Sequence, residues 1–482
     1  MSVHGSSARV PEICGRETDV EEATRRRDSV FAADTLIRLD SVRSAFGLAL
    51  HMHQPTIPAG GEDLPTADLI SNLEYMREHG DRRNRRKAAA YAECYRRMGD
   101  LIPDLVENGR QPRIMLDYSG NLLWAFEHAE RADVLEKLRR ITTDPRYQRN
   151  VEWLGTTWSH AVASSTPPED FQLHMRAWQS HFLSLFGPEA LSRVRGFSPP
   201  EMHLPNDPDV AYAYVEALVT CGYRWLLVQE DTVEQLDGSK VSRPHLPHRL
   251  VVRNASGREL SITALVKTQE SNLELIVRMQ PLKEARKLKR AKLSGVEIPQ
   301  MVTQIGDGEN SRTMLTKFPG AYASALESLG TSGVVMLCGT EYLEMVEAAG
   351  LKPADFIAIQ PAGQYRLWSR VKGTGRDAVD RAVAELSAED EDFHVEGGSW
   401  VQDRSWVRGY EGVLEPMTQL SRLFHERIDR RGIDPSERRY REALLYLLLS
   451  QTSCYRYWGG GRWTDYAREI CRRGTEVLHR QF

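Results

Sequence analysis

The chain has 482 residues, of which 41% are hydrophobic and 27% charged, and its formal net charge is −4. This is the composition of a soluble globular protein, long enough for one large domain with additions. The nearly neutral charge argues against the one-sided basic surface of a nucleic-acid-binding protein, and no stretch is typical of a signal peptide or membrane span. We therefore expect a cytoplasmic protein that binds neither nucleic acid nor membrane.

The cysteines are scattered and form no Cys-x-x-Cys pair, so a cysteine zinc site is not expected. They are Cys14, Cys94, Cys221, Cys338, Cys454 and Cys471. In a chain of this length they are typical of reduced, mostly buried thiols.

Residues 1–41 are polar and charged, with "ETDVEEATRRRDS" at their centre. This composition predicts a flexible arm or a short helix that carries no chemistry. The ordered fold is predicted to begin near Val42 and to continue as the main domain over residues 42–375.

In the main domain, strand-like apolar runs alternate with stretches of helical periodicity. The first strands are "AFGLALHMH", "RIMLDYSG" and "VEWLGTTWSH", and the helices between them are "RKAAAYAECYRRMGDLIPDLVEN" and "NLLWAFEHAERADVLEKLRRI". The alternation continues through "VRGFSPPE", "YRWLLVQED" and "GVVMLCGTEYLEMVEAAG". This order predicts an α/β fold, a parallel barrel with crossover helices.

Two later regions depart from this alternation. Near residues 240–300 the chain predicts an inserted region, with short strands in "SRPHLPHRLVVRNASGRELSITALV". There, "PLKEARKLKRAKLSG" is a basic helix or lid, or simply a solvated face. After about residue 410 the pattern is mostly helical, and residues 376–482 are assigned to a mostly helical C-terminal domain.

Polar and acidic side chains recur where the predicted strands end. They are His51, His53 and Gln54, then Asp117, Trp158 and His160, then Glu201, Glu230, Asp307 and Glu309. Ligands of α/β folds bind at the carboxyl ends of the strands. The recurrence of such endings therefore predicts the active-site face of a barrel.

Two carboxylates stand out among these endings. In "GFSPPEMHLP" two prolines precede Glu201 and stiffen the turn that carries it. In "VTQIGDGENSRTM" a β-branched run leads into Asp307. Taken alone, each motif is better explained as a surface turn. Taken together, they are the pair that glycoside hydrolysis requires, one attacking the anomeric carbon and one protonating the leaving oxygen.

His51 and His53 also suggest a metal site, with Asp117 or His160 as a third ligand. A structural or hydrogen-bonding role is more common for a lone His-x-His, and we predict no metal. No His-Glu-x-x-His, phosphate-loop or dinucleotide motif is present, so no cofactor is expected.

Aromatic side chains accompany the acids. Trp458 and Trp463 lie in the Gly-rich stretch "CYRYWGGGRWTDY", which does not suit a regular core element. We predict that these two indoles stack on sugar rings.

In order along the chain, the motifs resemble those of glycoside hydrolase family 57. His53-Gln54-Pro55 matches its first motif, and Phe197 to Glu201 fits the third, which carries the nucleophile. Asp307-Gly308-Glu309 fits the fourth, which carries the acid. The region from Glu152 to His160 is the loosest match, to the second motif. "SQTSCYRYWGGGRWTDYA", which contains Arg456, is similar to the fifth, substrate-contacting segment.

This resemblance implies a distorted (β/α)7 barrel with a mostly helical domain closing the cleft, and retaining chemistry on α-glucans without a metal. Glu201 is then the nucleophile and Asp307 the acid and base. The implied substrate-binding residues are His51, His53, Gln54, Asp117, Trp158, His160, Glu230, Glu309, Arg456, Trp458 and Trp463.

Three other functions stay open at this point. The first is a 4-α-glucanotransferase or branching enzyme that uses the same two carboxylates. The second is a metal-dependent deacetylase-like or mannosidase-like enzyme on a related barrel. The third is a non-catalytic carbohydrate-binding barrel.

Overall fold

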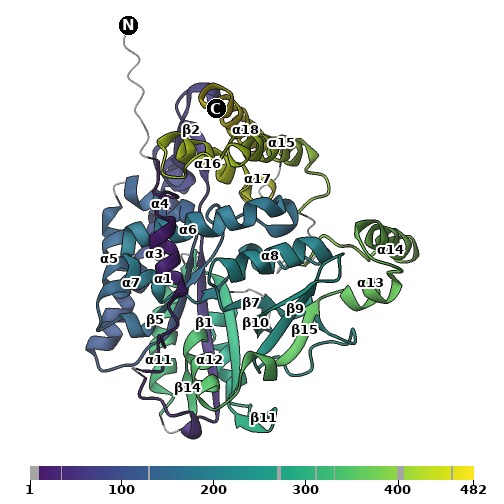
Figure 1. Cartoon of the computed structure of the whole chain (residues 1–482). Coiled ribbons are helices and arrows are strands. Elements are labelled where there is room, and N and C mark those ends of the chain that lie inside the picture. Colours follow the sequence, from purple (N-terminus) through teal and green to yellow (C-terminus); the bar gives the residue numbers. More distant parts are fainter. Residues whose placement is uncertain are drawn as a thin grey trace.

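The computed structural model describes residues 10–33, 35–128, 131–268, 273–309, 312–330, 332–398, 406–457 and 460–482. Within them, seven parallel strands form a closed barrel at the centre of the molecule (Figure 1). Around the ring they are β13 (Gln300–Asp307), β1 (Ser44–Met52), β4 (Ile114–Tyr118), β5 (Val151–Gly155), β6 (Gly196–Phe197), β7 (Trp225–Gln229) and β10 (Glu259–Lys267). Pairing of Lys267 with Thr303 closes the ring. The predicted (β/α)7 fold is confirmed.

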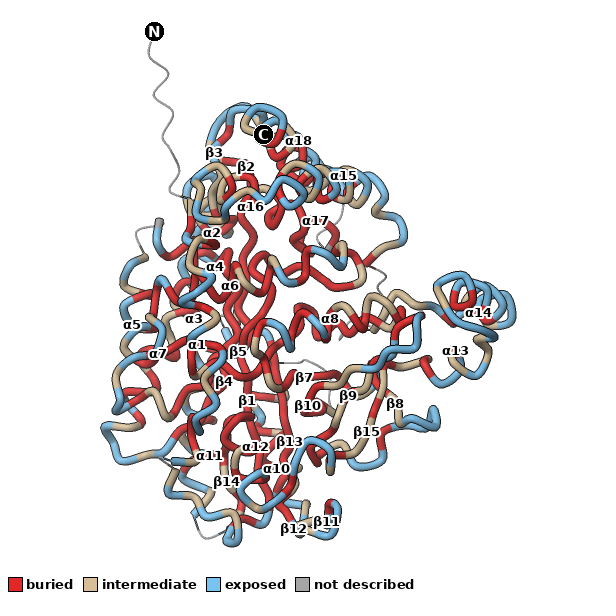
Figure 2. The backbone as a smooth tube through the Cα atoms, in the orientation of Figure 1, coloured by how far each residue is buried: buried red, intermediate tan, exposed pale blue. Residues whose placement is uncertain are grey.

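Helices cover the outside of the barrel, so its strands are buried on both faces. Every residue of β1, β4, β5 and β7 is buried, and Figure 2 shows the strands enclosed by helices whose outer faces are exposed. The main covering helices are α3 (Arg82–Glu107), α5 (Ala132–Thr143), α6 (Phe171–Phe186), α8 (Pro208–Thr220) and α12 (Gly339–Ala348). This burial explains the continuous apolar runs in the sequence.

One barrel strand lies in the region that was predicted to be an insertion. β10 pairs in parallel with β7 and antiparallel with β9 (His248–Arg253), and β9 extends the sheet through β15 (Ile357–Pro361) and β8 (Val233–Gln235). Because β10 follows β9 in an antiparallel hairpin, the sequence there does not show the alternation of strand and helix that predicted the other barrel strands. Conversely β14 (Val334–Met336), predicted as part of the alternation, pairs with β1 but lies outside the ring.

The basic segment proposed as a lid lies at the opposite end of the barrel from the strand carboxyl ends. Its helix, α10 (Gln280–Ala285), packs against β1 and β13. The Ser44 hydroxyl, at the start of β1, donates a hydrogen bond to the Ala285 carbonyl at 2.6 Å. The segment is therefore part of the base of the barrel.

The N-terminal segment packs on the barrel from Val10 onward. α1 (Glu17–Arg25) contacts α6 and α7 (Pro188–Ser192). The Glu344 carboxylate accepts hydrogen bonds from the backbone N–H groups of Val30, Phe31 and Ala32 at 2.6, 2.9 and 2.9 Å. Of the two predictions for this segment, the short helix is the one observed.

Four C-terminal helices pack together above the carboxyl ends of the barrel strands (Figure 1). They are α15 (Glu411–Arg427), α16 (Arg438–Ser450), α17 (Cys454–Tyr457) and α18 (Arg462–Gln481). α14 (Arg376–Glu389), which the prediction placed in the same domain, packs against α13 (Gln364–Arg370) and stands apart from them. The helical unit near the site therefore begins at residue 411.

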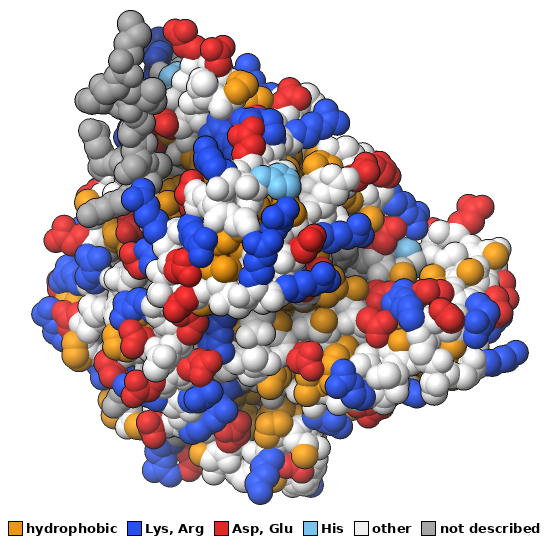
Figure 3. All heavy atoms as spheres, turned by 45° about the horizontal axis from the view of Figure 1, so that its top comes forward, with side chains coloured by type: hydrophobic (Ala, Val, Ile, Leu, Met, Phe, Trp, Pro, Cys, Tyr) orange, Lys and Arg blue, Asp and Glu red, His pale blue; other side chains and the backbone are white. Residues whose placement is uncertain are grey.

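The surface carries charges of both signs. Figure 3 shows Lys and Arg side chains interspersed with Asp and Glu over the face that includes the C-terminal helices. None of the described helices has both the length and the hydropathy needed to cross a membrane.

Close packing in the barrel predicts an outcome for two Gly→Ala changes. At Gly196 an added Cβ would lie 2.3 Å from the Trp225 ring, whereas at Gly320 on helix α11 (Phe318–Glu327) it would meet no atom within 4 Å. Gly196→Ala should cost about 1–3 kcal/mol through overpacking. Gly320→Ala should be neutral or stabilise by about 0.5–1 kcal/mol. Thermal unfolding midpoints check the pair, and equal midpoints would contradict the packing described.

Candidate active site

The pairing of β1 with its two neighbours sets three polar side chains in a row. His51 is opposite Asp117 of β4 on one side and opposite Asp307 of β13 on the other. Its Nδ1 atom lies 2.9 Å from Asp117 Oδ2. Burial by itself lowers the pKa of His51, but the Asp117 carboxylate outweighs this effect and raises that pKa to about 9. His51 is therefore a cation at neutral pH.

Two further imidazoles stack on this row. The rings of His53 and His160 are stacked with centroids 4.2 Å apart, and His160 lies 4.7 Å from the His51 ring. Burial and the neighbouring imidazoles hold the pKa of both His53 and His160 well below the usual value. These two rings are neutral at neutral pH, and a neutral imidazole offers one donor and one acceptor.

Glu201 follows Pro199 and Pro200 in the buried turn that ends β6. Its backbone is in the left-handed region, with φ 57°, and that of Met202 has φ 50°. Such conformations are costly for residues other than glycine and persist where the surroundings impose them, often at functional sites. Glu201 is 8% exposed, and its Oε1 atom lies 4.0 Å from His160 Nδ1. The structure thus places Glu201 beside the imidazole cluster.

Asp307 ends β13 on the other side of His51. Its Oδ1 atom accepts a hydrogen bond from the Glu309 backbone N–H at 2.9 Å. The residue keeps exposed surface, yet desolvation by the atoms packed around its carboxyl raises the pKa of Asp307, and the Glu309 N–H and the His51 charge oppose this only in part. A raised pKa favours the protonated acid.

Glu309 and Gln54 hold the end of β1 in place. Glu309 Oε1 accepts the His53 backbone N–H at 2.6 Å, and its Oε2 accepts the Gln54 side-chain amide at 3.0 Å. Asn72 donates to the Gln54 amide oxygen at 2.9 Å. Burial and the nearby Asp307 raise the pKa of Glu309 to about 8. These contacts position His53, and the predicted contact of Gln54 and Glu309 with substrate stays a prediction.

A turn of the helical unit reaches into the site between α16 and α17. Its Ser453 hydroxyl lies 2.8 Å from His160 Nδ1, and the Ser453 N–H donates to the His160 carbonyl at 3.2 Å. Cys454 Sγ lies 3.2 Å from His53 Nε2. Ser453 and Cys454 were not among the predicted site residues, because nothing local in the sequence indicates their distant partners.

Asp170, at the start of α6, anchors the same turn. It accepts hydrogen bonds from the Gln451 amide at 2.6 Å and from the Ser421 hydroxyl at 2.7 Å. His425 Nε2 lies 2.7 Å from it, and His174 Nε2 lies 2.7 Å from the Gln451 amide oxygen. This network connects the barrel to α15 and to the turn after α16, and none of its residues was predicted from the sequence.

Comparison with known proteins assigns the chain to a family. Residues 47–293, about half of the chain, match the sequence model of glycosyl hydrolase family 57. The chain belongs to this family. The prediction made from the motifs is confirmed, and with it the class, since the family is one of glycoside hydrolases. No curated protein matches the chain significantly in sequence.

Solved structures support the fold of this family 57 chain. It is similar to a 4-α-glucanotransferase from Thermococcus litoralis, with TM-score 0.57 and 17% identity over 92% of this chain. It spans 60% of that chain's length. It is also similar to the α-amylase AmyC from Thermotoga maritima, with TM-score 0.52 and 10% identity over 91% of this chain and 94% of that one. At such identities the likeness concerns the fold alone.

The remaining predicted site residues of this family 57 chain lie in different surroundings. Trp158 is completely buried and donates from its indole to His181 at 3.2 Å, so it packs inside the protein. Glu230 is half-buried near His245, Glu284 and Lys240, and the structure does not group it with Glu201 and Asp307.

Of the predicted fifth-motif residues, Arg456 lies on α17, next to the turn of the helical unit. Arg456 is completely buried with its Nε and Nη1 atoms unpaired, and burial lowers its pKa to about 10. Trp463 is half-buried on α18 and contacts Tyr466 edge-on. Trp458 lies outside the described residues.

No metal-binding group is formed by these side chains. Among the residues that the structure describes, no three His, Cys, Asp or Glu side chains are gathered as a metal ion would require.

The hydrogen bonds of His425 to Asp170 and Asp429 predict a pH dependence of protein stability. Burial alone lowers the pKa of His425, but its hydrogen bonds to Asp170 and Asp429 outweigh this and raise that pKa to about 10. The stabilisation from His425 is therefore complete below its unfolded pKa of about 6.5 and is lost as the pH rises toward 10. His425→Gln should lower the thermal unfolding midpoint most at pH 6 and least near pH 10. His479→Gln, at an exposed histidine, is the control, and a pH-independent effect of His425→Gln would contradict the network.

Proposed function

We propose that this family 57 chain breaks α-glucosidic bonds with retention, by double displacement through a glycosyl-enzyme. The observation that carries the proposal is that two carboxylates at the ends of barrel strands, Glu201 and Asp307, both act electrostatically on the buried His51. Glu201 is buried on a strained turn, Asp307 ends β13, and the charges of both act on His51. Glycoside hydrolases use such a pair of carboxyl groups, and the resemblance of the motifs to family 57 supports retention.

Glu201 is the nucleophile in this mechanism. The His51 cation lies near it and favours the ionised carboxylate that must attack C1. The surrounding turn fixes the backbone conformation of Glu201, so less conformational entropy is lost when the carboxylate is positioned for attack.

Asp307 is the general acid and then the base. Its raised pKa favours the proton that it must give to the leaving oxygen. Once Glu201 is esterified its negative charge is gone, and Asp307 ionises more easily to activate the incoming acceptor. The ring of His160 is neutral and its Nε2 atom has no hydrogen-bond partner among the described residues, so this atom suits a hydrogen bond to a sugar hydroxyl, whereas Ser119 and Cys454 already hold both ring nitrogens of His53.

The acceptor decides between two outcomes. Water gives hydrolysis, and a second glucan gives transfer, as in a 4-α-glucanotransferase or a branching enzyme. Exclusion of water by aromatic side chains favours transfer, and we propose Trp458 and Trp463 for this role. Two other functions have less support. The described residues form no metal-binding group to serve a deacetylase-like enzyme, and a non-catalytic barrel would not need both carboxylates.

A product analysis tests the proposal. Wild-type protein incubated with maltoheptaose and with soluble starch should give new oligosaccharides. Glu201→Gln removes the nucleophile and should lower the rate by about a thousandfold or more. EDTA should change nothing. Shorter products alone indicate hydrolysis, and longer ones in addition indicate transfer. Products that persist in Glu201→Gln, or that EDTA abolishes, would refute the mechanism.

The acid role of Asp307 has its own test. Asp307→Asn should slow bond cleavage strongly in maltoheptaose, whose leaving oxygen needs a proton. It should slow the first step much less for a nitrophenyl glycoside, whose leaving group departs without one. Rapid-mixing measurements of nitrophenol release check this difference. An equal loss on both substrates would remove Asp307 from the acid role.

A further inference from the structure

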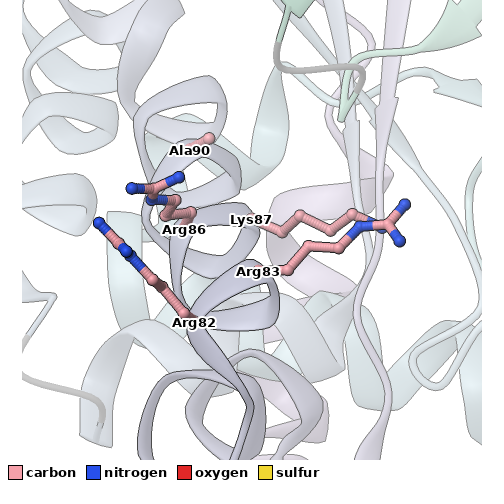
Figure 4. A pocket seen from close by; sticks show the side chains of 5 residues that line it. All are labelled: Arg82, Arg83, Arg86, Lys87 and Ala90. Atoms are coloured by element: carbon pink, nitrogen blue, oxygen red, sulfur yellow. The ribbon is translucent and has the colours of Figure 1, made fainter.

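The first two turns of α3 carry a dense group of cations. Arg82, Arg83, Arg85, Arg86 and Lys87 are all exposed, and none makes an ion pair or a side-chain hydrogen bond with a described residue. Figure 4 shows Arg82 and Arg86 projecting from one side of the helix and Arg83 and Lys87 from the other. With Ala90, these four line a shallow surface hollow. These five cations form what we call the basic face.

The cations of the basic face destabilise the start of helix α3. Cations at a helix N-terminus are disfavoured by the helix dipole, and like charges four residues apart repel. The N-cap Asp81 adds one negative charge, but its carboxylate already accepts the Asn84 N–H at 2.7 Å. Glu78 nearby pairs with Arg77 at 2.8 Å. The positive charge of the basic face is therefore largely uncompensated.

The second half of the same helix is different. Arg96 contacts Glu93 at 2.7 Å and Asp100 at 3.1 Å, and Asp100 also pairs with Lys137 at 3.1 Å. The whole chain carries a net charge of −4, so acidic residues are not scarce. The lack of counter-ions is a property of the basic face, and an anion from outside the chain would supply them.

The basic face lies on the same helix as two tyrosines, Tyr91 and Tyr95, that interact with the carboxyl groups of the candidate active site. The segment Thr313–Lys317, which follows the acid motif, packs against α3. Tyr91 is half-buried, and burial together with the charges of Glu309 and Asp307 raises its pKa. Lys87 and Arg83 precede Tyr91 by one and two turns, which is about 6 and 12 Å along a helix axis.

We infer that the basic face binds an anionic group carried by the glucan on which the two carboxylates act. The inference rests on the proposed function. Arginine forms paired hydrogen bonds with phosphate and carboxylate groups, so a phosphate ester or a carboxylate on a glucosyl unit has the required chemistry. Lys87 and Arg83 are one and two helical turns away from Tyr91, which interacts with Glu309 and Asp307, so the inferred anionic unit is one beyond the unit that reacts. The ligand is therefore an anionic glucan chain rather than a small sugar phosphate at the reacting position.

Equilibrium binding tests the inference without depending on turnover. The probes are fluorescently labelled starch fragments in three forms: phosphorylated, the same material after phosphatase treatment, and carboxymethylated. The test variant is Arg83→Gln/Arg86→Gln/Lys87→Gln, which keeps good helix formers. The control, Lys287→Gln/Lys289→Gln/Lys292→Gln, removes the same charge from exposed lysines at the base of the barrel.

Wild type and control should bind an anionic form about tenfold more tightly than the neutral form, since each exposed ion contact changes affinity a few-fold. The test variant should lose this preference. In wild type the preference should shrink between about 50 and about 300 mM salt. Preference for the phosphorylated form alone would identify phosphate as the anion, and equal preference for the carboxymethylated form would identify any anionic glucan.

Equal wild-type affinity for neutral and anionic forms would overturn the inference, as would an equal loss in the control. Comparable affinity for single-stranded RNA or for phosphatidylserine vesicles, lost in the same variant, would replace the glucan with another polyanion and also overturn it. Turnover of neutral maltoheptaose, measured with wild type, test variant and control, tests the proposed function separately. It should be unchanged in the variant.

Discussion

The parallel pairing of β1 between β4 and β13 is the constraint on which the candidate site depends. It sets His51 beside Asp117 and Asp307 at the carboxyl end of the barrel. Side chains alternate between the two faces of a strand, so a slip by one residue would turn His51 away from both carboxylates. An imidazole held between carboxylates keeps its proton, and its positive charge favours the ionised form of Glu201 nearby. Strand register thus sets the charge state of the site.

The helical unit completes the site. His53 and His160 are buried and neutral, and hydrogen bonds rather than charge fix their orientation. Ser119 of the barrel and Cys454 of the helical unit hold His53, and Ser453 holds His160. The turn that supplies Ser453 and Cys454 is anchored by Asp170. A shift of the helical unit would therefore change the hydrogen bonds that orient the imidazoles of His53 and His160.

Several site features followed from the sequence because they depend on local chemistry. The two prolines before Glu201 predicted a rigid turn, and the structure shows an imposed left-handed backbone there. Other features depended on packing. Trp158 was predicted to contact substrate, but the indole is enclosed and hydrogen-bonded to His181. Glu230 ends a strand as predicted, yet it lies among a different set of charges.

The sequence by itself determined the alternation of strands and helices, the family, and the carboxylates at strand ends, because each of these is written in short local motifs and in their order along the chain. The tertiary structure alone decided that β10 closes the ring and β14 does not, since periodicity reports the burial of a strand but not its neighbours. It also decided that Ser453 meets His160 from 293 positions away. A hydrogen bond between such distant residues leaves no local pattern, because it exists only once the chain has folded.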